Sequence, residues 1–162
     1  MTVFLSLGTN IGDRLHNLEK VYFLIEMEEK INIISKSKIY ETSPVENLDQ
    51  EYFLNQIIKI DTDIEPLQLL NLIKNIENKM GRIELEKKYM PRIIDIDILA
   101  YDRLILNSKK LSIPHLKIKS RKFILKPWSD IDPNYILSNS KSTIKELLNN
   151  ISHLKDEVKE YN

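Results

Sequence analysis

The order in which strand-like and helical patterns follow one another most constrains the fold of this chain. Strand-like segments are rich in β-branched and aromatic residues, whereas helical ones repeat apolar residues at three- and four-residue steps. In chain order the patterns are a strand over 2–7, a helix over 15–25 with Asp13 as its cap, strands over 31–40 and 52–60, a helix from Pro66 to Gly81, a strand over 93–101 and a terminal helix near 142–151. Up to residue 101 this is the split βαβ order, in which two helices cover one face of an antiparallel sheet. We therefore predict an α+β sandwich of the ferredoxin-like kind.

Length and composition indicate a single globular unit. Of the 162 residues, 42% are hydrophobic and 30% are charged, which is typical of one folded domain. We expect residues 1–152 to form this domain and residues 153–162 to be a frayed, polar C-terminal tail. The formal net charge is +0, so no overall field attracts nucleic acid or an anionic membrane, and no segment is long and apolar enough to span one. The chain has no cysteine, which excludes a disulfide framework and a thiolate site. We expect a cytoplasmic monomer.

The segment from Pro91 to Leu99 carries the sharpest chemical feature of the sequence. Alternate side chains of a strand share a face, so Asp95 and Asp97 point the same way while the intervening isoleucines point into the core. Two adjacent carboxylates repel each other unless a cation lies between them, and hard oxygen ligands favour Mg²⁺. Arg92 favours the same interpretation, because guanidinium groups commonly bind a transferring phosphoryl group. The alternative is a surface strand whose aspartates face only water.

These residues also match a known family. The motif Arg92-x-x-Asp95-x-Asp97 resembles the signature of the 6-hydroxymethyl-7,8-dihydropterin pyrophosphokinases of folate biosynthesis. Further segments resemble that family's motifs in its order and spacing: Gly8-Thr9-Asn10, Tyr40-x-Thr42-x-Pro44, Phe53-Leu54-Asn55, Glu77-x-x-x-Gly81-Arg82, Ile113-Pro114-His115 and Arg121-x-Phe123. The resemblance runs from Met1 to about Ile151, and agreement of so many separated motifs makes it specific.

The resemblance implies an enzyme that transfers pyrophosphate from ATP to 6-hydroxymethyl-7,8-dihydropterin and releases AMP. It implies that Asp95 and Asp97 bind two Mg²⁺ ions, and that Arg82, Arg92 and Asp97 are catalytic. The residues implied to bind ATP are Glu77, Arg82, Arg92, Ile98, Lys110, His115 and Arg121. Those implied to bind the pterin are Asn10, Thr42, Pro44, Val45, Phe53, Asn55, Tyr89 and Phe123.

Chemistry supports these roles, and simpler ones stay open. Two aromatic faces can hold a flat bicyclic ring, and the Asn55 amide offers both donors and acceptors to the edge of a pterin. Phenylalanines more often pack in a core, and most arginines are solvated surface charges. His115 could instead cap the turn after Pro114, and Glu77 could pair with Lys74 or a loop arginine. Asn10 could be a turn residue.

Some positions depart from the family pattern. The segment from Glu84 to Met90 is less basic than is common, with Tyr89 where tryptophan is usual. Phe53, Lys110 and Leu116 replace a tyrosine, an arginine and a tyrosine of relatives. We expect residues 83–91 to form a loop that closes over substrates, with Tyr89 packing down on closure. The glutamates of this loop would make closure over a polyphosphate less favourable.

Two other classes of function compete with the enzyme. One is a catalytically idle pterin- or nucleotide-binding module, against which paired metal-binding carboxylates argue. The other is RNA binding, because RNA-recognition modules share this architecture. Zero net charge and the lack of a basic, aromatic sheet motif argue against RNA.

Overall fold

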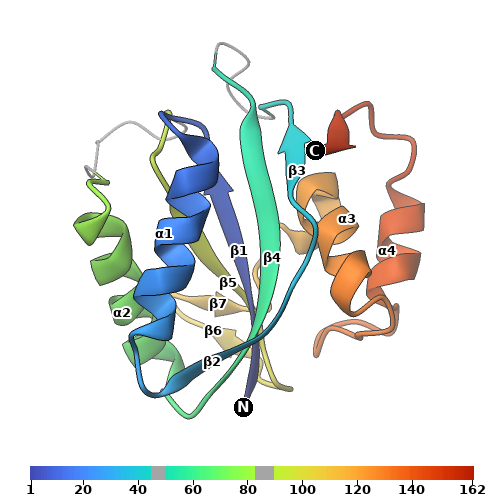
Figure 1. Cartoon of the computed structure of the whole chain (residues 1–162). Coiled ribbons are helices and arrows are strands. Elements are labelled where there is room, and N and C mark those ends of the chain that lie inside the picture. Colours follow the sequence, from blue (N-terminus) through green and yellow to red (C-terminus); the bar gives the residue numbers. More distant parts are fainter. Residues whose placement is uncertain (45–49, 83–89) are drawn as a thin grey trace.

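A central antiparallel sheet lies between two layers of helices in the computed structural model, which describes residues 1–44, 50–82 and 90–162 (Figure 1). The strands are β1 (Thr2–Thr9), β2 (Ile31–Lys36), β3 (Tyr40–Thr42), β4 (Phe53–Thr62), β5 (Asp95–Tyr101), β6 (Leu106–Asn107), β7 (Ser112–Ile113) and β8 (Val158–Glu160). The helices are α1 (Arg14–Glu26), α2 (Pro66–Lys79), α3 (Lys122–Ile131) and α4 (Ile144–Asn150), with a 3₁₀ turn η1 at Ile118–Ser120. Within the described residues no helix is long and apolar enough to cross a membrane.

The sheet has the predicted topology. Its strand order is β5-β1-β4-β3-β8, with β2 also paired to β4, and β6 and β7 form a separate two-stranded ribbon. All these pairings are antiparallel. This order confirms the ferredoxin-like α+β prediction. β1 lies inside the sheet and is covered on both faces, which explains why polar and apolar residues alternate only weakly along it.

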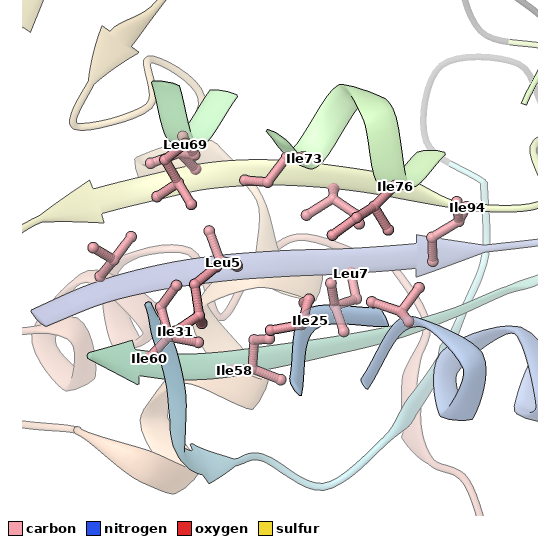
Figure 2. Close-up of a cluster of buried hydrophobic side chains, with 14 of the residues drawn as sticks. Leu5, Leu7, Ile25, Ile31, Ile58, Ile60, Leu69, Ile73, Ile76 and Ile94 are labelled. Carbon is pink, nitrogen blue, oxygen red and sulfur yellow. The ribbon is translucent and has the colours of Figure 1, made fainter. Parts of the chain in front are cut away.

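One face of the sheet packs against α1 and α2, as predicted. Leu5 and Leu7 of β1 meet Ile25 of α1 and Ile73 of α2 in this core, which Figure 2 shows in close-up. Ile94, Ile96 and Ile98 enter the same core, as their alternation with the two aspartates predicted. Local signals fix the helix ends: the Asp13 side chain accepts a hydrogen bond from the His16 amide at 3.0 Å, and Gly81 follows α2 with φ +91°.

The opposite face carries a second helical layer that the sequence patterns showed only in part. α4 confirms the predicted terminal helix, and Thr143 and Glu146 form a capping box at its start. α3 was not predicted, because Pro127 interrupts its helical pattern. The Trp128 ring of α3 lies 4.6 Å from the Phe4 ring of β1, centre to centre, so this second core covers the part of the face around Phe4.

The last residues of the chain do not form the frayed end that their polar composition indicated. Val158–Glu160 form β8 and pair with β3 at the edge of the sheet. Figure 1 shows this end of the chain beside β3 and α3. The strand is specified by a partner more than a hundred residues earlier, so its own residues give little sign of it.

Candidate active site

Polar side chains gather on the half of the second sheet face that α3 and α4 leave uncovered. Asp95 pairs in register with Gly8, and Asp97 pairs with Ser6, so the two carboxylates lie beside β1. On its other side Gly8 pairs with Asn55 of β4. The two aspartates face away from the isoleucine core, as the alternation predicted, and they open into a pocket rather than into bulk water.

A single pocket brings together most of the predicted site residues. Those of its lining that the sequence predicted are Thr42, Pro44, Phe53, Asn55, Arg92, Asp95, Asp97, Arg121 and Phe123. The pocket is also lined by residues that the sequence analysis did not select, namely Ser6, Ser43, Gln50, Met90 and Gly8. Ser6 and Gly8 could have been predicted, because the two-residue period of β1 puts both on the same face of the sheet.

Asp95 is held by two guanidinium groups. Arg82 lies at the end of α2 and its Nη1 is 2.6 Å from Asp95 Oδ1, while Arg92 forms an ion pair with the other carboxylate oxygen. Burial raises the pKa of Asp95, but the charges of Arg92 and Arg82 lower it by more, so the pKa lies below its ordinary value. Asp95 is therefore an anion near neutral pH. Arg92 lines the pocket, whereas Arg82 lies outside the lining and meets the site through Asp95.

Asp97 has the opposite electrostatic setting. Burial, and then the charge of Asp95, raise the pKa of Asp97 above its ordinary value. His115 and Arg121 act against that rise. Burial lowers the pKa of His115, although Asp97 opposes the effect. A carboxylate whose charge is disfavoured by its neighbour is the kind that gains from an added cation.

Glu77 lies behind the site rather than in the pocket lining. Its carboxylate is 1% exposed and accepts hydrogen bonds from Lys74 Nζ at 2.8 Å and from the Ile96 amide at 2.7 Å. It also pairs with Arg82. Glu77 thus ties α2 to β5 and orients the guanidinium that reaches Asp95, which favours the simpler role of an ion-pair partner.

The other end of the pocket suits a flat polar ring. Asn55 Nδ2 donates to Thr42 Oγ1 at 2.7 Å, which fixes the amide and leaves its carbonyl group over Gly8. Phe53 and Phe123 line the pocket from β4 and from the start of α3. The guanidinium of Arg121 lies 5.4 Å from the centre of the Phe123 ring, between the aromatic and the acidic parts of the site.

Asn10 links the two segments that flank the pocket. Its Oδ1 accepts from the Arg92 amide at 2.7 Å, and its Nδ2 donates to Gln50 Oε1 at 3.2 Å and to the Glu51 carbonyl at 3.3 Å. The backbone amide of Asn10 donates to the Arg92 carbonyl at 3.1 Å. The side chain is 3% exposed and is used in these bonds. The pterin contact predicted for Asn10 stays a prediction, and the structure gives the residue a linking role.

The remaining predicted residues lie outside the pocket lining. The Ile98 side chain packs in the α1–α2 core, so only the backbone of this residue could make the predicted contact with ATP. Lys110 is exposed in the turn between β6 and β7. His115 caps a turn, since its Nδ1 accepts from the Lys117 amide at 3.2 Å. Val45, Tyr89 and the proposed closing loop at 83–91 fall wholly or largely outside the described residues.

The site can supply two carboxylate ligands to a metal ion. In the described parts of the chain no group of three or more His, Asp or Glu side chains is placed to hold an ion on its own. Mg²⁺ does not need such a cage, because it commonly binds one or two carboxylates together with substrate phosphates and water. Asp95 and Asp97, with like charges on one strand face, fit this requirement.

Comparisons with known proteins agree with this site. Residues 4–133 match the family model of 7,8-dihydro-6-hydroxymethylpterin-pyrophosphokinase. A 2-amino-4-hydroxy-6-hydroxymethyldihydropteridine pyrophosphokinase from Methylorubrum extorquens is 34% identical over 145 residues, which cover 90% of each chain. A folic acid synthesis protein from Schizosaccharomyces pombe is 35% identical over 148 residues, and the match covers 91% of this chain but only 20% of the yeast protein. The chain thus spans about a fifth of that longer relative.

The fold also has solved counterparts. The wild-type HPPK-DHPS protein of Plasmodium falciparum superposes with a TM-score of 0.76 at 22% identity, covering 92% of this chain and 44% of the other. At that identity the likeness concerns the fold alone. The chain matches less than half of the Plasmodium protein.

Proposed function

The chain belongs to the 7,8-dihydro-6-hydroxymethylpterin-pyrophosphokinase family, and from this premise we propose that it transfers pyrophosphate from ATP to 6-hydroxymethyl-7,8-dihydropterin, giving AMP and the pterin diphosphate. One observation carries the proposal. A single pocket has acidic and guanidinium groups at one end and aromatic and amide groups at the other. The first end matches a polyphosphate with its cation, and the second matches a flat heterocycle. No observation favours an idle binding module or an RNA-binding role.

The acidic end would hold the reacting phosphates. We propose that Asp95 and Asp97 bind Mg²⁺, with two ions expected, and that the metal when bound neutralises phosphate charge and orients the attacking oxygen. Arg82 and Arg92 neutralise Asp95 in the absence of ligand. When ATP is bound, some of their N–H groups would donate to its phosphates. Arg121 would add positive charge near Asp97, and His115, whose lowered pKa favours the neutral imidazole, would offer a hydrogen-bonding group there.

The aromatic end would fix the pterin. Phe53 and Phe123 would lie against the two faces of the ring, and Asn55, held by Thr42, would bind its amide-like edge. A pterin held in this way would direct its hydroxymethyl group toward the acidic end of the pocket. The contribution of the chain is therefore largely positioning, which can lower the barrier of a displacement between two bound substrates by several kcal/mol, on the order of 7 or more.

The bond that breaks distinguishes this activity from an ordinary kinase. Attack on the β-phosphorus of ATP releases AMP, whereas attack on the γ-phosphorus releases ADP. The purified chain should be incubated with ATP, Mg²⁺ and the pterin alcohol, and the nucleotides separated by chromatography. We expect AMP in equal amount to pterin diphosphate, and none without the pterin. ADP as the main product refutes the pyrophosphokinase assignment, and tight pterin binding without nucleotide turnover indicates an idle module.

We further propose that the protein acts as a cytoplasmic monomer. Size-exclusion chromatography with light scattering tests the oligomeric state, and fractionation of source cells tests the compartment. A mass of twice 19.1 kDa in solution would contradict the monomer.

A further inference from the structure

The segment formed by residues 157–161, here called the C-terminal strap, completes the sheet next to the pterin end of the pocket. Within it β8 pairs with β3 so that Val158 lies opposite Thr42 and Glu160 opposite Tyr40. β3 is only three residues long and has β4 on its other side. Without the strap, β3 would be an edge strand with an open row of backbone groups. The strap also lies outside residues 4–133, over which the chain matches its family.

The strap contacts chain on both sides of residues 44–51. The Ser43 amide donates to the Glu157 carbonyl at 3.2 Å, and the Glu157 amide donates back to Ser43 Oγ at 3.3 Å. Tyr52 donates its hydroxyl hydrogen to the Glu157 carboxylate at 3.3 Å. Ser43 lines the pocket, and Tyr52 precedes Phe53, which also lines it. A single residue of the strap thus contacts both a lining residue of the pocket, Ser43, and the residue before another one, Phe53.

Further contacts fix the strap to the same region. The Tyr161 amide donates to the Ile39 carbonyl at 2.9 Å. Arg14 from the start of α1 lies 6.0 Å from the centre of the Tyr161 ring, pairs with Glu41 at 2.8 Å and donates to the Tyr52 carbonyl at 2.7 Å. These bonds join α1, β3 and the strap around the pterin end, and they leave the acidic end untouched.

We propose that the C-terminal strap is a positioning element for pterin binding, which holds Thr42 and Ser43 in the geometry that the ring requires. Thr42 links the strap to the pterin site, because its hydroxyl accepts the hydrogen bond that orients Asn55. The strap touches neither Asp95 nor Asp97, so it acts on the pterin and not on ATP. This inference rests on the proposed function for its substrate.

The test compares three variants with the wild-type chain. The first deletes residues 157–162. The second, Glu157→Pro, removes the amide hydrogen that Ser43 Oγ accepts, and the third, Glu157→Ala, keeps that amide and removes only the half-exposed carboxylate. We expect the deletion and Glu157→Pro to raise the KM for the pterin about three- to tenfold, as the loss of one or two neutral hydrogen bonds would. Glu157→Ala should stay within about twofold of wild type, since exposed polar contacts contribute little.

The KM for ATP separates positioning from general damage. It should be unchanged in all three variants, whereas a merely structural strap would alter both KM values or lower the amount of active enzyme alone. An unchanged pterin KM in both the deletion and Glu157→Pro overturns the inference, as does an equal rise for both substrates. Wild type assayed in parallel distinguishes this failure from the absence of AMP formation, which would instead refute the proposed activity.

Hydrogen exchange without ligands tests the strap independently of turnover. The Ser43 amide should exchange faster in the deletion and in Glu157→Pro, while amides of β1 keep the wild-type rate. If Ser43 exchange is unchanged in both variants, the strap does not hold Ser43 in place, and the inference fails even if the KM values change.

Discussion

Two substitutions of Asn10 should distinguish its effect on the acidic end of the active site from its effect on the pterin end. The side chain makes three hydrogen bonds while 3% exposed, one to the Arg92 amide and two to the segment at Gln50 and Glu51. At about 1 kcal/mol for each net bond, Asn10→Ala should reduce the free energy of unfolding by about 3 kcal/mol. It also leaves the Arg92 amide without its side-chain acceptor. We expect both a lower kcat and a higher pterin KM.

Asn10→Asp is the matched variant. A carboxylate oxygen still accepts from the Arg92 amide, but the other oxygen faces the acceptors Gln50 Oε1 and the Glu51 carbonyl. The pterin KM should therefore rise as in Asn10→Ala, whereas kcat should fall less than in Asn10→Ala, because the Arg92 amide keeps its acceptor. Urea denaturation gives the stability change, and steady-state kinetics with each substrate varied gives the KM values. If Asn10→Ala loses less than about 1 kcal/mol, or if Asn10→Asp lowers kcat as much as Asn10→Ala does, Asn10 does not link the two ends.

Three further substitutions test the electrostatics and the geometry of the site. Asp97→Ala should lower turnover at least about 100-fold if this carboxylate binds the metal, and the urea midpoint should not fall, because the raised pKa shows that its charge is disfavoured in the folded state. Thr42→Val should raise the pterin KM about tenfold with little effect on ATP, because Asn55 loses the acceptor that orients it; an equal change for both substrates would count against this. Glu77→Ala should cost about 2–3 kcal/mol in urea unfolding, since it leaves the buried Ile96 amide without an acceptor and removes one of the two carboxylates that pair with Arg82, and a loss below about 1 kcal/mol would refute its structural role.

Local patterns were sufficient to predict the half of the fold that carries the carboxylates. The alternation of Asp95 and Asp97 with isoleucines fixed which face of β5 is polar, because a strand has only two faces. Asp13 and Gly81 marked helix ends correctly, because a cap and a positive φ are properties of a few adjacent residues. These signals needed no knowledge of distant parts of the chain.

Features that depend on distant partners could not be predicted this way. β8 exists because β3 offers it an edge, and α3 tolerates Pro127 because Trp128 and its neighbours are buried against β1. The link that Asn10 makes between Gln50 and Arg92 joins three separate segments, so no local pattern reveals it. The grouping of Thr42, Asn55 and Phe123 in one pocket was expected only from the family resemblance.

Gly8 limits how the pterin end of the pocket can evolve. A Cβ built on this residue would lie 3.0 Å from Asn55 Oδ1, so any side chain here pushes the amide by some tenths of an ångström. The floor of the pocket at this point is therefore main chain, which substitution cannot reshape without disturbing Asn55. An inhibitor seated against Gly8 would leave few routes to resistance. Escape mutations would have to act through lining side chains such as Pro44 and Met90, and compounds that rest mainly on Gly8 should retain potency longest.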